Sequence, residues 1–226
     1  MVQFNLEHRE LTLKVVYYGP ALSGKTTNLK ALHAMAPSEA TGRLMTLETQ
    51  DDRTLFFDLL PLKVETQSGF RLKIKLFTVP GQVIHQSTRR LVLQGADAVA
   101  FVADSQIQQS TANKHAFADL QVNLAANQLA ADLPMVVQFN KQDLESVRSL
   151  TEIRAFGHRV NRAVIPAVAV DGEGVIETLH TLLDHCWAQL DTQYDIGERL
   201  ELSKNEFLNQ FFTDWRPHYA GIGRHA

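Results

Sequence analysis

Cysteine, long apolar runs and an excess of positive charge are scarce or missing in this sequence of 226 residues. Cys186 is the single cysteine, so no intramolecular disulfide can form, and we expect a reducing compartment. No apolar run approaches the roughly 20 residues that a membrane-spanning helix needs. Lysine and arginine total 22 against 25 aspartates and glutamates, which excludes the strong basic field of a typical nucleic-acid-binding protein. We therefore predict a cytoplasmic protein that does not bind nucleic acid.

Sorting and lipidation signals are missing as well. The first residues, MVQF, show neither a signal-peptide pattern nor a glycine for myristoylation, and the last residues, GRHA, contain no cysteine for prenylation. We expect no direct membrane anchor, so that any contact with a membrane comes through a partner protein.

What the sequence does contain is a regular alternation of strand-like and helix-like segments. Six runs are predicted as strands, at 11–18, 55–64, 70–79, 98–103, 135–139 and 164–170. The second and third are expected to form an antiparallel pair. Helices are expected at 26–35, at 174–190 and after the fourth and fifth strands. Because this alternation favours parallel crossovers, we predict an α/β fold with a mostly parallel six-stranded sheet and helices on both faces.

The sequence divides into a predicted domain, 1–190, and a C-terminal extension, 191–226. In the extension, Ser203 and Glu206 form a capping-box pattern, which marks the start of a short amphipathic helix. Its apolar side carries Phe207, Leu208, Phe211, Phe212 and Trp215. Two interpretations are open: the helix packs on its own domain, with Trp187 as an anchor, or it docks a partner or senses mobile loops.

A glycine-rich loop lies between the first strand and the first helix. Its sequence, GPALSGKT at 19–26, is a complete G-x-x-x-x-G-K-[ST] pattern, in which backbone N–H groups and a helix N-terminus surround phosphate groups. Lys25 would contact the β- and γ-phosphates, and the Thr26 hydroxyl would ligate Mg²⁺. A plain glycine turn is the alternative, and the flanking strand and helix argue against it. The residues predicted to contact the nucleotide here are Gly19, Pro20, Ala21, Leu22, Ser23, Gly24, Lys25, Thr26 and Thr27.

A second motif, NKQD at 140–143, predicts the choice of base. The Asp143 carboxylate can accept hydrogen bonds from both N1–H and the 2-amino group of guanine, whereas adenine offers no such pair of donors. Asn140 would tie this loop to the phosphate loop, and the Lys141 stem would lie along the base. The turn at Val168 and Ala169 takes the place of a further base loop, where the Ala169 N–H could donate to the guanine carbonyl. Together the two motifs predict a site for GTP and GDP.

The segment TVPGQ at 78–82 closes the strand predicted at 70–79. Gly81 could donate its N–H to the γ-phosphate, and Gln82 could orient an attacking water molecule. Most GTPases have aspartate at the position of Thr78. A neutral hydroxyl there would hold the water molecules around Mg²⁺ more weakly than a carboxylate.

Two other features are interpreted as structural. Arg89 and Arg90 follow the glutamine loop and are expected to form a solvated helix face rather than a surface for a partner. Cys186 lies on the apolar stripe of its helix and is expected to be inert core.

At these residues the chain resembles the bacterial gliding-motility small GTPases of the MglA type, which are Ras-like switches. The matching stretches are VYYGPALSGKTTNL, DDRTLFFDLLPL, FTVPGQV, VAFVADSQI, NKQDL and AVAVDGEGV, and the threonine of TVPGQ is itself a mark of that family. The resemblance implies a P-loop GTPase fold, Mg²⁺-dependent GTP hydrolysis and recruitment to a cell pole. It also implies motility or polarity effectors and a roadblock-type, MglB-like homodimer that activates hydrolysis.

The resemblance also assigns roles in the polar loop before the second predicted strand. Arg53 would be an arginine finger supplied by the chain itself, which neutralises charge that grows on the phosphates; such fingers are worth roughly 10³–10⁵ in rate. Thr54 would contact Mg²⁺ and the γ-phosphate. Asp52 and Asp58 could support the Mg²⁺ site without binding the ion directly, through the groups that do bind it. Without the resemblance, Arg53 would be interpreted as a solvated loop arginine.

Ala21 departs from the family pattern, which usually has glycine at this position. In Ras-like sites a side chain there crowds the γ-phosphate, the glutamine and any arginine finger, so we expect a low intrinsic hydrolysis rate. The alternative is that the small alanine is tolerated because the loop adjusts. The leading hypothesis is a GTPase switch whose loops are ordered by GTP. A GTP-held scaffold with negligible hydrolysis is the alternative that Ala21 favours. A P-loop kinase or ATPase is a third hypothesis, and it leaves the NKQD motif unexplained.

Overall fold

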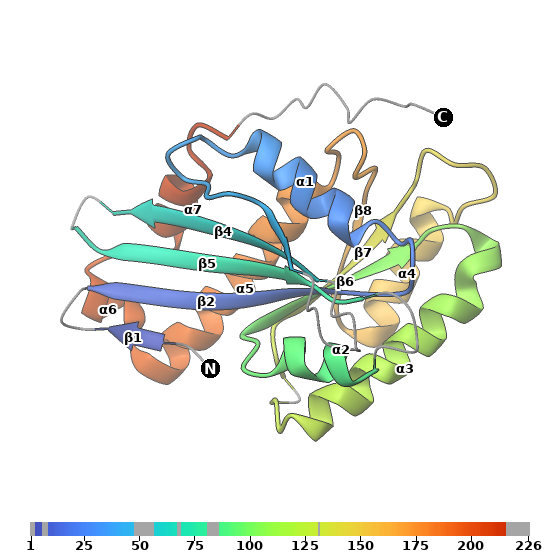
Figure 1. Cartoon of the computed structure of the whole chain (residues 1–226), viewed down its shortest axis with the longest axis horizontal. Helices are drawn as coiled ribbons and strands as arrows, with labels where there is room; N and C mark the ends of the chain where they lie inside the picture. The colour runs from blue at the N-terminus through green and yellow to red at the C-terminus, as the bar shows by residue number, and fades with distance from the viewer. Residues whose placement is uncertain are drawn as a thin grey trace.

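A single mixed β-sheet forms the centre of the fold (Figure 1). The computed structural model describes residues 3–5, 9–47, 57–66, 69–80, 86–130 and 132–215. Within these ranges eight strands form the sheet in the order β3-β4-β5-β2-β6-β7-β8, with β1 paired to β2. The strands are β1 (Gln3–Asn5), β2 (Glu10–Tyr18), β3 (Met45–Leu47), β4 (Phe57–Glu65), β5 (Arg71–Thr78), β6 (Ala98–Asp104), β7 (Met135–Asn140) and β8 (Ala163–Pro166).

Parallel pairing dominates the middle of the sheet, as predicted. β2 is parallel to β5 and β6, and β7 and β8 continue in parallel from β6. β4 runs antiparallel to β5, which confirms the predicted pair. β1 and β3 raise the number of strands above the six predicted, because segments of three residues each are too short to show a period. The last strand ends at Pro166 rather than at residue 170, since Val168 turns back to bridge Glu173.

Helices cover both faces of the sheet, which confirms the predicted layers. They are α1 (Lys25–Met35), α2 (Gln86–Leu93), α3 (Ser110–Ala126), α4 (Leu150–Val160), α5 (Val175–Tyr194), α6 (Ile196–Leu200) and α7 (Lys204–Phe212), with a short 3₁₀ turn, η2 (Ile107–Gln109). Leu29 of α1 and Leu179 of α5 belong to the core on one face, and Leu93, Leu120 and Ile153 belong to the core on the other. β6 and β7 are buried at every position, as expected for parallel strands covered on both sides. Among the described residues, no helix is both long enough and apolar enough to cross a membrane.

The C-terminal helices pack on α5 and join the core of that face. Trp187 of α5 stacks on Phe207 of α7, with ring centroids 4.7 Å apart. Ser203 and Glu206 form the expected capping box at the start of α7. The aromatic side of the helix is therefore buried against its own domain. The domain boundary at residue 190 stays a prediction, and α5 runs through it.

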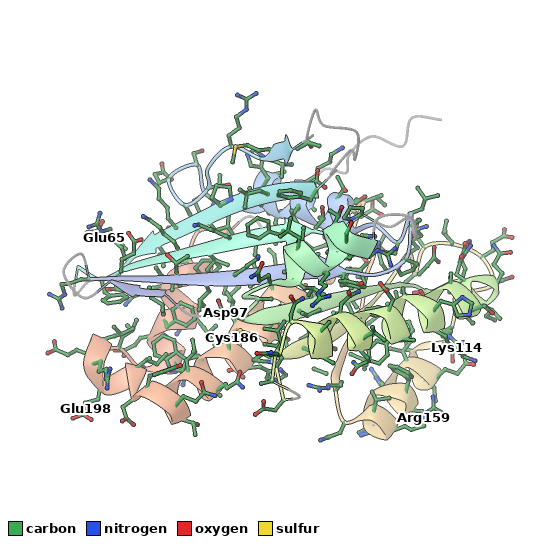
Figure 2. All side chains as sticks on the ribbon, turned by 60° about the horizontal axis from the view of Figure 1, so that its bottom comes forward. Glu65, Asp97, Lys114, Arg159, Cys186 and Glu198 are labelled. Atoms are coloured by element: carbon green, nitrogen blue, oxygen red, sulfur yellow. The ribbon has the colours of Figure 1, made fainter. Side chains whose placement is uncertain are left out.

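Cys186 lies in the interior, at the side of α5 that meets the sheet. Figure 2 labels it next to Asp97, and its Sγ lies 3.9 Å from the Asp97 carbonyl oxygen. Burial, with a smaller effect from the Asp97 charge, raises the pKa of the thiol well above its usual range. A thiol that stays protonated is a poor nucleophile, in agreement with the interpretation of Cys186 as inert core.

Candidate functional site

The loops that carry the sequence motifs meet at one edge of the sheet. The phosphate loop follows β2, the NKQD loop follows β7, and the turn at 167–174 follows β8. Because β2, β6, β7 and β8 are parallel, their carboxyl ends lie together. In Figure 1 the arrowheads of β6 and β7 point to the side of the molecule on which α1 begins. Open α/β sheets bind their ligands at such an edge.

Two glycines allow the phosphate loop to take its path. Gly19 and Gly24 have φ angles of 145° and 100°, in the region that side chains rarely permit. A Cβ on Gly19 would lie 2.2 Å from the Val102 carbonyl oxygen, and a Cβ on Gly24 would lie 2.1 Å from Asn140 Nδ2. The loop therefore passes too close to β6 and to the NKQD loop for any other residue at these two positions.

Lys25 is buried among the carbonyl groups of the phosphate loop. Its Nζ donates to the carbonyl oxygens of Gly19 at 3.1 Å and Pro20 at 2.6 Å. Burial lowers the pKa of Lys25 to about 7; Arg89 adds to this effect and Asp58 opposes it. Neutral carbonyls replace only part of the hydration that a buried ammonium loses, so an anion in the loop would favour the charged form. This environment suits a phosphate group.

A cavity of about 500 Å³ opens beside Lys25. Its volume lies within the roughly 300–1,000 Å³ that is typical of small-molecule sites. The lining residues come from the phosphate loop, from the start of β4 and from the end of β5, and they are Ala21, Leu22, Gly24, Lys25, Thr26, Thr27, Thr46, Phe57, Asp58, Thr78, Val79 and Pro80.

Asp58 is a buried carboxylate in this cavity, and three threonine hydroxyls donate to it. The hydroxyls of Thr26 and Thr78 donate to Oδ2 at 2.6 and 3.0 Å, and the hydroxyl of Thr46 donates to Oδ1 at 2.9 Å. Thr78 in turn accepts from the Asp58 N–H at 2.9 Å. A negative charge therefore lies next to Thr26 although position 78 has none. The carboxylate comes from β4 instead of the end of β5.

Asn140 joins the loops of three strands. Its Nδ2 donates to the Ser23 carbonyl oxygen at 2.9 Å, and its Oδ1 accepts from the Ala169 N–H at 2.9 Å. Asn140 is itself buried. One side chain thus fastens the phosphate loop, the NKQD loop and the turn at 167–174 to one another.

One part of the base site, the Ala169 N–H, differs from the expected arrangement. The Ala169 N–H, expected to donate to guanine, is used by Asn140, whose buried oxygen needs a donor. The N–H of the next residue, Val170, has no partner within the described part of the chain. Lys141 pairs with Asp104 at 2.7 Å, and the side chain of Asp143 is exposed.

Arg89 does not lie on a solvated helix face, so that interpretation is wrong. The residue is 3% exposed; Nη1 pairs with Asp119 at 2.7 Å and Nε donates to the Pro80 carbonyl oxygen at 2.9 Å. Its guanidinium also lies over the Tyr18 ring. Asp119 is 30 positions away in the sequence and Pro80 is nine positions away, so both lie beyond the spacing within one helix that the prediction used. Arg89 fastens the residue directly before Gly81.

Several predicted site residues lie outside the described residues: Asp52, Arg53, Thr54, Gly81 and Gln82. Their roles stay predictions. Of the groups expected to act on the γ-phosphate, only Lys25 is among the described residues.

Comparisons with known proteins agree with these motifs. Residues 2–186 match the ADP-ribosylation factor family. The chain is also similar to the mutual gliding-motility protein MglA of Myxococcus xanthus (strain DK1622), with 45% identity over 177 residues, which are 77% of this chain and 90% of that protein. The family match covers the phosphate loop, Asp58, the NKQD loop and the turn at 167–174.

Proposed function

The chain belongs to the ADP-ribosylation factor family of Ras-like GTPases and hydrolyses GTP, and from this premise we propose that it is a switch through which GTP and GDP control gliding motility or cell polarity. The main observation in support is the position of Asn140, which connects the phosphate loop and the turn at 167–174 to the NKQD motif, expected to select guanine. A switch needs a firmly held nucleotide, since only then do the loops report whether the γ-phosphate is present. The motility role rests on the name of the similar Myxococcus protein.

Guanine nucleotide would bind along the three fastened loops. The phosphate loop, 19–27, would hold the phosphates, with Lys25 as their cation. Asp143 would accept from N1–H and the 2-amino group of guanine. The Lys141 stem would lie along the base while its ammonium keeps the ion pair with Asp104. In place of Ala169, the N–H of Val170 would donate to the guanine carbonyl.

Mg²⁺ fits the oxygen groups of the cavity. This ion takes oxygen ligands and keeps several of its water molecules, and the Thr26 hydroxyl beside the Asp58 carboxylate offers such a set. We assign Thr26 and Thr54 as ligands and Asp58 as the group that holds the surrounding water. Bound Mg²⁺ would offset the negative charge of the phosphates. Asp58 would thereby supply the charge that Thr78 lacks.

Hydrolysis is assigned to residues around the γ-phosphate. Gln82 would orient the attacking water, Arg53 would neutralise charge that develops on the phosphates, and Lys25 would contact the β- and γ-phosphates. The Gly81 N–H would donate to the γ-phosphate. Ala21, on the wall of the cavity, would crowd these groups, so the intrinsic rate would be low.

A low intrinsic rate leaves room for an activating partner. By resemblance we propose a roadblock-type, MglB-like homodimer in this role, together with motility or polarity effectors that bind the GTP state. The protein would be cytoplasmic and would reach a cell pole through such a partner.

Single-turnover GTP hydrolysis with Mg²⁺, with and without the roadblock-type partner, tests the proposal. We expect the partner to accelerate hydrolysis, and we expect Arg53→Ala and Gln82→Leu to abolish that acceleration. Ala21→Gly should raise the intrinsic rate. Tight GTP binding with negligible hydrolysis in every case except Ala21→Gly would instead favour the alternative, a GTP-held scaffold.

A further inference from the structure

A buried group of three polar side chains lies behind the nucleotide site. Asn28 of α1, Gln138 of β7 and Thr178 of α5 are all 0% exposed, and no role was predicted from the sequence for any of them. Their positions in the fold are informative. α1 follows the phosphate loop, β7 leads into Asn140, and α5 follows the turn at 167–174. Each member therefore lies on an element that carries one of the three binding loops.

The three side chains form a continuous chain of hydrogen bonds. The amides of Asn28 and Gln138 pair reciprocally, with both N–O distances at 2.8 Å, and Gln138 Nε2 also donates to the Thr178 hydroxyl at 2.9 Å. At one end Asn28 Nδ2 donates to the Gly24 carbonyl oxygen at 3.0 Å. At the other end the Thr178 hydroxyl donates to the Gly174 carbonyl oxygen at 2.6 Å. The chain thus runs from the phosphate loop, through β7, to the turn at 167–174.

All donor protons of these side chains are used. Asn28 gives its two amide protons to Gly24 and Gln138, Gln138 gives its two to Asn28 and Thr178, and Thr178 gives its hydroxyl proton to Gly174. A fully satisfied buried network holds its members in one arrangement, whereas the loss of one member leaves the others with unpaired groups. The network therefore opposes any change in the relative position of the three elements.

We propose that the Asn28–Gln138–Thr178 network is a positioning device that sets how slowly guanine nucleotide dissociates. The inference rests on the proposed function, because it takes guanine nucleotide as the ligand. Asn140 links the loops directly, through hydrogen bonds to Ser23 and Ala169. The network links the same loops indirectly, by joining α1, β7 and α5, the elements next to those loops. A nucleotide can contact the NKQD loop with its base and the phosphate loop with its phosphates only while the distance between these two loops matches its own length. Preorganised loops therefore release it slowly.

Thr178→Val tests the network with little change of shape. Valine fills nearly the same space, but its side chain neither donates nor accepts hydrogen bonds. One Gln138 N–H therefore loses its partner, and the Gly174 carbonyl keeps only the backbone N–H of residue 178 as a donor. We expect the dissociation rate of N-methylanthraniloyl-GDP (mant-GDP), measured with excess unlabelled GDP, to rise about tenfold, which corresponds to about 1.4 kcal/mol. Thr178→Ser keeps the hydroxyl and should restore the slow rate. Gln138→Leu removes the central member and should release mant-GDP faster than Thr178→Val does.

Thr66→Val is the matched control. Thr66 is 5% exposed and its hydroxyl accepts from the Phe70 N–H at 3.0 Å, in the hairpin at the opposite end of β4 from Asp58. This variant removes a buried hydroxyl far from the nucleotide, so it should lower the melting temperature without changing mant-GDP release.

Two results would overturn the proposal. One is a Thr178→Val protein with a lower melting temperature and an unchanged dissociation rate, which would make the network merely structural. The other is an equal acceleration in Thr66→Val, which would assign the effect to a general loss of stability. A wild-type protein that fails to bind mant-GDP would contradict the guanine-nucleotide site itself, and so would be distinguished from both.

Discussion

Asp58→Asn removes the negative charge beside Thr26 while keeping the size of the side chain. In the structure this carboxylate accepts from three hydroxyls, and its Oδ2 lies 2.6 Å from the Thr26 hydroxyl oxygen that we assign to Mg²⁺. Asparagine has one oxygen, so one side of it would present N–H groups to hydroxyls that now donate. We therefore expect Asp58→Asn to weaken Mg²⁺ binding.

The expected loss of Mg²⁺ affinity depends on how close the Asp58 carboxylate lies to the metal site. Unit charges 4 Å apart near a protein surface interact by about 4 kcal/mol, and the water around a metal ion offsets part of this. Groups that support a ligand without touching the metal typically contribute 10–100-fold to metal affinity. We expect a loss in that range, on the order of 1.4–2.7 kcal/mol.

The assay is the release of mant-GDP as a function of free Mg²⁺. Thr78 Oγ1 lies 3.0 Å from Asp58 Oδ2, so an aspartate at position 78 would place a carboxylate near the same point. The double variant Asp58→Asn/Thr78→Asp should recover most of the Mg²⁺ affinity. Thr78→Asp alone brings two carboxylates together and should destabilise the protein. An unchanged Mg²⁺ requirement in Asp58→Asn would refute the reasoning.

Three further predictions concern other parts of the structure. Phe207→Ala should lower the free energy of unfolding in urea by about 3–5 kcal/mol, because the ring is 2% exposed and stacks on Trp187; a change under about 1 kcal/mol would mean that α7 adds little to the domain. Arg89→Met removes the donor to the Pro80 carbonyl and should slow partner-stimulated hydrolysis in single-turnover assays more than it weakens GDP binding, and an equal effect of the neighbouring Arg90→Met would count against this role. Asp143→Asn should weaken GDP binding by about 100-fold and favour xanthosine diphosphate, whose base has a carbonyl in place of the 2-amino group; competition against mant-GDP measures both, and an unchanged preference for guanine would contradict the base assignment.

The parts of the fold that the sequence could predict depend on local signals. The apolar run at 98–103 became β6, and the capping box at Ser203 begins α7. Repeated apolar spacing and a capping pair are each visible within a few residues. β1 and β3 gave no such signal, because three residues cannot show a period.

The polar interior of the site could not be predicted in the same way. Gln138 lies within the apolar run that became β7, and its partner Asn28 is 110 positions away in the sequence. Asp58 was a possible support for Mg²⁺, but only the structure brings it to Thr26 and Thr78. Arg89 resembled a surface residue for the same reason. Pairing between distant polar groups is decided by the tertiary fold, which no single segment encodes.

The stacking of α7 on α5 has a practical consequence for anyone who shortens this protein. The sequence suggests residue 190 as a natural end of the domain, yet Leu200, Phe207 and Phe211 belong to the same core as Trp187. A chain cut at 190 would expose the face of α5 that these side chains cover. Exposed apolar surface of this kind promotes aggregation. Shortened versions should therefore keep residues up to 215, so that poor solubility is not mistaken for a property of the GTPase domain.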